Sequence, residues 1–171
     1  MNDFDQIFII KVMAKYSRER AVLYARNYWN KRNPKFYNFD KIGGDCTNFV
    51  SQCLFYGGFD MKFTTNGWFY SSINLRSPAW SGVNEFCDFL ITNISEDSPR
   101  GRIVSLSDIE VGDVIQLDLG RGFFHHNTIV TNVLGEKNLN NILIACHTAD
   151  AFDKPLSDYN IKKTRCIKIM N

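Results

Sequence analysis

The strongest constraint in this sequence is a pair of glycines followed by a helical pattern that begins at a cysteine. Gly43 and Gly44 allow a backbone turn with positive φ, and Asp45 is a residue type that often caps a helix N-terminus. The apolar residues that follow recur at i, i+3, i+4, i+7 and i+8, which predicts one buried helix face: Cys46, Phe49, Val50, Cys53 and Leu54. A second pair of glycines at 57–58 can end this helix.

Cys46 falls in the first turn of the predicted helix. Backbone amides there lack intrahelical acceptors, and the helix dipole favours an anion. A thiol at this place is expected to ionise more easily and to become a better nucleophile. The alternative is a core role, because free cysteine is among the most buried residue types. We assign Cys53 to the core, whereas the spacing alone leaves Cys46 open between core and catalysis.

Length and composition indicate a globular protein and give no sign of a nucleic-acid, metal or cofactor partner. The 171 residues suffice for one domain with a core, and we expect a single domain over residues 1–171. Hydrophobic residues make up 44% and charged residues 22%, and the net charge of +2 is too small to argue for nucleic acid. The five cysteines form no CxxC motif and have no short histidine spacing, so we expect no metal, no cofactor and no disulfide framework.

The N-terminal residues and the apolar runs bear on localisation. The first five residues are acidic rather than basic, and residues 7–12 are too short for a signal-peptide core. No apolar run approaches the length of a membrane span. Unpaired cysteines suit a reducing compartment. We therefore expect a cytoplasmic protein without a membrane partner.

Helical patterns occupy the N-terminal half and strand patterns the C-terminal half. Helices are predicted at residues 4–15, 17–32, 46–57 and 81–91, and a loop is predicted at 92–102. Strands are predicted at 114–118, 123–133, 142–148 and 165–170, with a hairpin turn at 120–122. Helices followed by an antiparallel sheet indicate an α+β fold.

The three histidines all fall in the predicted sheet. His125 and His126 are adjacent on one strand, so alternation should leave only one of them facing a cleft. His147 lies on the next strand and can be a cross-strand neighbour of His126. A thiol nucleophile needs a base, and the base needs a third group to orient it. Cys46, His126 and His147 would supply all three, although each histidine taken alone is more often a structural residue.

An aromatic group surrounds the predicted turn at Asn66-Gly67. Its members are Trp68, Phe69, Tyr70 and Trp80. Such side chains either anchor the core and its loops or form the wall of a substrate pocket.

Several stretches in one order resemble the putative amidase domains, a family related to the NlpC/P60 and CHAP cysteine peptidases. The resemblance covers about residues 16–168, and its most specific part is Gly44-Asp45-Cys46-Thr47-Asn48-Phe49-Val50-Ser51-Gln52. The other matching stretches are residues 20–25, 111–116, 126–131, 147–150 and 155–156.

The resemblance implies a papain-like (NlpC/P60-like) fold with Cys46 as the nucleophile and His126 as the base. It disfavours His125, and it places the third group at His147, with Asp150 as the competing candidate. Asn127 stands where serine is more usual in the family. The cysteine stretch also implies supporting or oxyanion roles for three polar residues: Asp45, Asn48 and Gln52.

The expected chemistry is acyl transfer through an acyl-thioester on Cys46. The expected substrate is a peptide or an acyl amide or thioester, either free or bound to a carrier. Water as acceptor would make an amidase or peptidase, and an amine would make an amide-forming acyltransferase in an intracellular pathway. Two alternatives stay open. Relatives of this kind commonly act on the bacterial cell wall, which would make the protein a cell-wall peptide hydrolase, and the domain could also be an inactive papain-like binding module.

Overall fold

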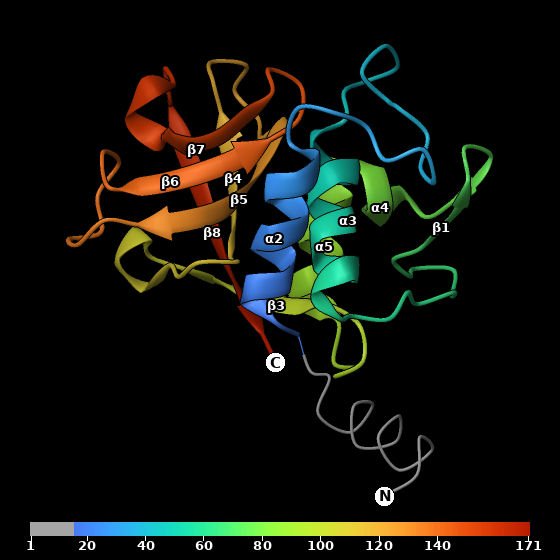
Figure 1. Cartoon of the computed structure of the whole chain (residues 1–171). Helices are drawn as coiled ribbons and strands as arrows, with labels where there is room; N and C mark the ends of the chain where they lie inside the picture. The colour runs from blue at the N-terminus through green and yellow to red at the C-terminus, as the bar shows by residue number, and fades with distance from the viewer. Residues whose placement is uncertain (1–15) are drawn as a thin grey trace, which may run out of the picture.

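The computed structural model describes residues 16–171, so the predicted helix at 4–15 lies outside the described part of the chain. Helices gather on one side of the molecule and strands on the other (Figure 1). The helices are α2 (Arg18–Tyr28), α3 (Cys46–Gly57), α4 (Pro78–Ser81) and α5 (Val83–Thr92). This arrangement of an N-terminal helical part and an antiparallel sheet confirms the α+β prediction.

The main sheet is antiparallel, with the order β3-β8-β4-β5-β6-β7. Its strands are β3 (Arg100–Val104), β4 (Val114–Asp118), β5 (His126–Val133), β6 (Ile142–Cys146), β7 (Ala151–Pro155) and β8 (Lys163–Met170). A short hairpin, β1 (Tyr70–Ser72) with β2 (Leu75–Arg76), lies outside it. The prediction of a loop at 92–102 is wrong at its C-terminal end, because residues 100–104 form β3 and pair with β8. Strand β7 was also not predicted from the sequence.

Helix α3 is buried on nearly all sides, which explains why its polar residues are also internal. The four apolar residues predicted to face the core are fully buried: Phe49, Val50, Cys53 and Leu54. Helix α3 packs against α2, α4 and strand β5. Gly58 ends the helix with a φ of 124°, a conformation that glycine adopts without steric cost.

Alternating side chains give the sheet a packed layer on each face. Val114, Ile129 and Ala145 point toward the helices and share one core with them. Ile115, Val130 and Ile144 belong to the second core cluster. The helix layer therefore holds α3 against β5, so that the start of α3 and the start of β5 meet.

Two strands are shorter than predicted, and this changes the environment of the histidines. Strand β5 begins at His126, and a loop at 119–125 precedes it, in which the Asp118 carboxylate accepts hydrogen bonds from three backbone amides of residues 120–122. Strand β6 ends at Cys146, and His147 begins a turn. His125 and His147 are thus loop residues, to which strand alternation does not apply.

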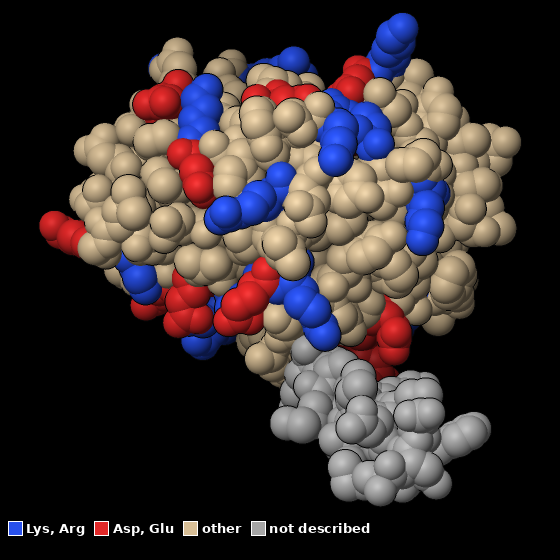
Figure 2. Space-filling view, viewed as in Figure 1, with Lys and Arg blue, Asp and Glu red and all other residues tan. Residues whose placement is uncertain are grey.

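The face of the molecule seen in Figure 1 carries lysine and arginine side chains interspersed with aspartate and glutamate (Figure 2). No continuous basic surface appears on this face (Figure 2). Within residues 16–171, no helix combines the length and the apolar character that crossing a bilayer would require.

Candidate active site

Cys46 is the first residue of α3 and lies at a cleft of about 410 Å³. We call this hollow the Cys46 cleft. Its lining consists of Gly43, Gly44, Cys46, Leu119, Arg121, His125, His126, Thr148, Ala149, Lys154 and Tyr159. Only 5% of the Cys46 surface is exposed, so the thiol is reached through this cleft rather than from an open surface.

The surroundings of the Cys46 thiol hold it in its neutral form. Burial raises the pKa of the thiol, and the backbone amide of Asn127 and the hydroxyl of Thr47, 3.9 Å from Sγ, act in the opposite direction. Desolvation is the larger effect. The prediction that the helix start makes the thiol ionise more easily is therefore wrong for the resting state.

His126, the first residue of β5, lies in the same cleft. Burial lowers the pKa of its imidazole to about 4, with a smaller contribution from the charge of His125. The ring is consequently neutral near pH 7 and can accept a proton. Its side chain makes no hydrogen bond within residues 16–171, so no described group fixes its tautomer.

A hydrogen bond between side chains brings the cysteine and the histidine together. Asn127, the neighbour of His126, donates from Nδ2 to Oγ1 of Thr47, the neighbour of Cys46, at 2.8 Å. This link joins the second residue of β5 to the second residue of α3. The structure thus places the predicted nucleophile and the predicted base in one cleft.

His125 also lines the Cys46 cleft, which corrects the expectation that only one histidine of the pair would face it. Its Nδ1 lies 3.0 Å from the carbonyl oxygen of Phe123 and 4.0 Å from Oδ1 of Asp118. The side chain is thereby held against its own loop.

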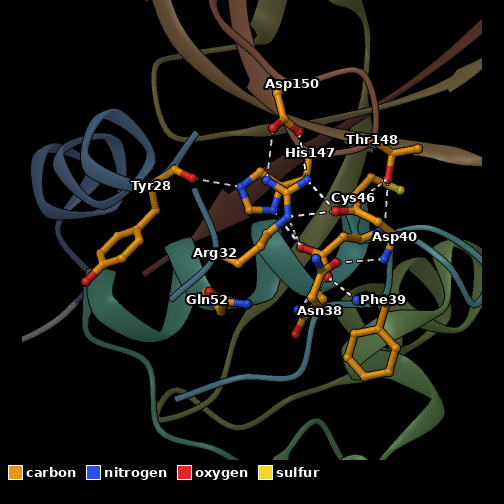
Figure 3. A network of polar contacts seen from close by, with 12 residues as sticks. Tyr28, Arg32, Asn38, Phe39, Asp40, Cys46, Gln52, His147, Thr148 and Asp150 are labelled. Carbon is orange, nitrogen blue, oxygen red and sulfur yellow. Dashed lines mark hydrogen bonds and ion pairs between the residues drawn. The ribbon is translucent and has the colours of Figure 1, made fainter. Parts of the chain in front are cut away.

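His147 does not contact His126. Its Nδ1 lies 2.6 Å from Oδ2 of Asp45, and its Nε2 lies 2.8 Å from the carbonyl oxygen of Tyr28 (Figure 3). The ring is buried and stacks on Phe49 with a centroid distance of 4.0 Å. Because both ring nitrogens already have acceptors, the predicted hydrogen bond to His126 is not formed.

Asp150, the competing third group, is also engaged elsewhere. Arg32 forms two hydrogen bonds with its carboxylate, at 2.9 and 3.0 Å, and contacts Asp40 at 2.7 Å and Asp45 at 3.5 Å (Figure 3). Arg32 lies beyond α2 and was not identified from the sequence. No local motif marks it, since its three partners come from distant segments.

The residues predicted to support the oxyanion have structural roles. Asp45 accepts from the backbone amide of Phe39 and from the side-chain amide of Asn48, each at 2.9 Å, and makes no capping hydrogen bond with a backbone amide of α3. The Asn48 amide oxygen accepts from Trp80 at 2.7 Å, and the buried Gln52 accepts from a tyrosine hydroxyl at 2.6 Å. None of the three side chains lines the Cys46 cleft.

The predicted aromatic wall does not face the Cys46 cleft: its two tryptophans belong to the core, and Phe69 and Tyr70 are half-buried elsewhere. Trp68 and Trp80 are fully buried, with their ring centroids 4.8 Å apart. Phe69 stacks on Phe63, and the Tyr70 hydroxyl accepts from a loop amide at 2.9 Å. None of the four predicted residues belongs to the lining of the Cys46 cleft. The residues that do line it alongside the cysteine and histidines include Tyr159, which no sequence pattern indicated.

The described part of the chain contains no candidate metal site. No three histidine, cysteine, aspartate or glutamate side chains there are grouped closely enough to hold a metal ion. All five cysteines are free and buried.

The fold and the cleft define a class: an α+β protein with a cysteine at the start of a buried helix and two histidines across a cleft at the sheet. The chain belongs to the putative amidase domain family, which matches residues 15–170. It is also similar to the uncharacterized protein YhbB of Bacillus subtilis (strain 168), with 37% identity over 123 residues. That alignment covers 68% of this chain and 37% of the relative. No solved structure matches the chain.

Proposed function

We propose that this protein is a cysteine-dependent amidase that works through an acyl-thioester on Cys46. The observation that carries the proposal is the shared cleft, in which Cys46 begins a buried helix and His126 begins the adjacent strand. Membership of the putative amidase domain family supports amide hydrolysis as the class of reaction. The order of helix cysteine and strand histidine also supports a papain-like relationship.

The protonation states suggest how the reaction begins. Because burial keeps the thiol protonated and the imidazole neutral, His126 takes the thiol proton as sulfur attacks the amide carbonyl. The new C–S bond produces a tetrahedral oxyanion, which the backbone N–H of Cys46 can stabilise. His126 then gives the proton to the leaving nitrogen as the C–N bond breaks, and an acyl-thioester remains.

Water completes the reaction in the proposed mechanism. His126 removes a proton from water as the water attacks the thioester, and the carboxylic acid leaves as the thiol re-forms. An amine acceptor would give an acyltransferase instead. None of the four aromatic residues that would have favoured an amine by excluding water lines the Cys46 cleft, so hydrolysis is the better supported outcome.

His147 has a different part in this proposal from the one predicted. It touches neither the thiol nor His126, and it holds the residue that precedes Cys46. We therefore treat His147 as a positioning residue and place Arg32 beside it in the same network.

The test compares Cys46→Ser with Cys53→Ala, a buried cysteine on the same helix. The substrates are short peptides, simple N-acyl amides and muropeptides, with acyl-thioesters plus amines in parallel. We expect Cys46→Ser to lower hydrolysis by at least about 10³-fold and Cys53→Ala to retain it per folded molecule.

Intact-mass spectrometry should detect an acyl adduct that Cys46→Ser lacks. Turnover retained without the Cys46 thiol would refute the proposal. The absence of both turnover and adduct would favour the binding module, and efficient transfer to amines without hydrolysis would favour the acyltransferase.

A further inference from the structure

The charged side chains that line the Cys46 cleft are cationic. Arg121 comes from the loop before β5, and Lys154 comes from β7, at the end of the sheet. No aspartate or glutamate belongs to the lining. The net charge of the whole protein is only +2. Its Cys46 cleft nevertheless carries two basic side chains and no carboxylate in its lining.

Four aspartates in segments around the cleft have partners elsewhere in the fold. Asp118 accepts from three backbone amides of the 120–122 turn, at 2.8 to 3.2 Å. Asp40 and Asp150 both pair with Arg32, and Asp45 pairs with His147. Each of these four carboxylates is thus held by partners within the fold, and none of them belongs to the lining of the cleft.

Neither cation of the cleft has an ion-pair partner within residues 16–171. The Nζ atom of Lys154 lies 4.4 Å from the ring centroid of Tyr159, which keeps the ammonium against the cleft wall. The same Tyr159 ring lies 6.3 Å from the ring of His126. Lys154 and the proposed base are thus both neighbours of Tyr159.

We infer that the Cys46 cleft binds an acyl substrate that carries a carboxylate, and that Arg121 and Lys154 bind this group. The inference rests on the proposed function and adds the substrate class to it. The guanidinium of Arg121 can bind a carboxylate through two parallel hydrogen bonds, and Lys154 adds a point charge. The Tyr159 ring and Leu119 supply the apolar surface for the rest of the acyl group.

Two alkylating reagents of almost equal size test the inference. Iodoacetate carries a carboxylate and iodoacetamide is neutral, and both form the same kind of thioether with Cys46, releasing iodide. At pH 8, where His126 is uncharged, we expect the ratio of the iodoacetate rate to the iodoacetamide rate to exceed that of free cysteine. The ratio should fall as salt is added, because salt screens the attraction.

Arg121→Gln and Lys154→Gln remove the two charges one at a time. Each should lower the iodoacetate rate about three- to tenfold, the effect of one unit charge several ångströms away, and change the iodoacetamide rate less than twofold. Lys154→Arg should keep the wild-type ratio. Arg102→Gln is the control, because Arg102 is exposed on β3, at the opposite edge of the sheet.

The outcomes separate the inference from the function on which it rests. If Cys46 reacts with both reagents and the ratio is the same in wild type, Arg121→Gln and Lys154→Gln, the inference is overturned and the amidase proposal stands. If Cys46 reacts with neither reagent, both are overturned. Once an amide substrate is known, the same variants should raise KM for a carboxylate-bearing substrate and leave KM for its neutral amide unchanged.

Discussion

Nδ1 of His147 lies 2.6 Å from Oδ2 of Asp45, and this buried pair connects the turn after β6 to the residue that precedes Cys46. The turn makes a second connection, since the amide of Asp45 donates to Oγ1 of Thr148 at 2.8 Å. The start of α3 is therefore held by a segment about a hundred residues away in the sequence.

Loss of this pair should affect stability and the reactivity of the thiol together. We expect His147→Ala to lower the free energy of unfolding by about 3 kcal/mol, because it removes the 2.6 Å partner of the buried Asp45 carboxylate and leaves only Arg32, at 3.5 Å, as an ion-pair partner. Urea unfolding measures this loss. The rate of Cys46 alkylation in the folded protein should also fall, while the acid limb of the pH–rate profile stays in place. A shifted acid limb would instead show that His147 acts on His126 directly.

Asp150→Asn is the matched comparison for His147→Ala. Asp150 pairs with Arg32 near the surface, where an ion pair contributes at most about 1 kcal/mol. The variant should keep wild-type turnover within about threefold. A loss of 10² or more, as expected for a group that orients the base, would restore Asp150 as the third catalytic residue.

The lowered pKa of His126 should make the free energy of unfolding depend on pH. The ordinary pKa of histidine is 6.5, whereas that of His126 in the folded protein is about 4. Between these two pH values, the side chain is protonated in the unfolded chain and neutral in the folded protein. The free energy of unfolding should therefore decrease by up to about 3 kcal/mol as pH falls through this range, and change no further from this cause below pH 4.

Urea unfolding of wild type and His126→Asn at pH 7.5, 5.5 and 4.5 measures the His126 contribution, which the variant should lack. Hydrolysis should show an acid limb near pH 4 rather than near 6.5, because the neutral ring is the base. His125→Ala serves as the control and should retain most activity. An acid limb that follows His125 instead would identify His125 as the base.

Trp80 should contribute to stability rather than to substrate binding. It is fully buried, and its Nε1 donates to Asn48 at 2.7 Å. Trp80→Ala should cost about 3–5 kcal/mol in unfolding free energy through the cavity it leaves. Phe63→Ala, which removes an exposed ring, should cost less than about 1 kcal/mol. A raised KM in Trp80→Phe with unchanged stability would contradict the core assignment.

Alanine variants of Gly43 and Gly44 can separate two effects on the start of α3: backbone strain from a positive φ, and a steric contact with Thr148. Both have φ near +100°, so alanine at either position should destabilise the protein by about 1–2 kcal/mol. A Cβ at Gly44 would also lie 3.3 Å from Oγ1 of Thr148, whereas a Cβ at Gly43 would meet nothing within 4 Å. Gly44→Ala should therefore slow Cys46 alkylation more than Gly43→Ala does. Equal alkylation rates would show that the contact with Thr148 does not position the thiol.

The local pattern of residues was sufficient to predict the helix that carries the cysteine. Apolar periodicity located α3, and the glycine at its end stops it, because both features depend on neighbours along the chain. The α+β class followed in the same way from the order of helical and strand patterns. The placement of His126 at the cysteine was likewise expected, and the structure brings the two residues to one cleft.

Tertiary structure alone decided the partners of the polar groups. Strand β6 ends one residue before His147, so this ring turns to Asp45 and Tyr28 rather than to His126. Burial, which depends on packing from distant segments, raised the pKa of the Cys46 thiol against the effect of the helix start. The same packing placed Trp68 and Trp80 in the core and left the cleft to residues that no periodic pattern marks. Local sequence determines which elements form, whereas hydrogen-bond partners, burial and pKa depend on which segments the fold brings together.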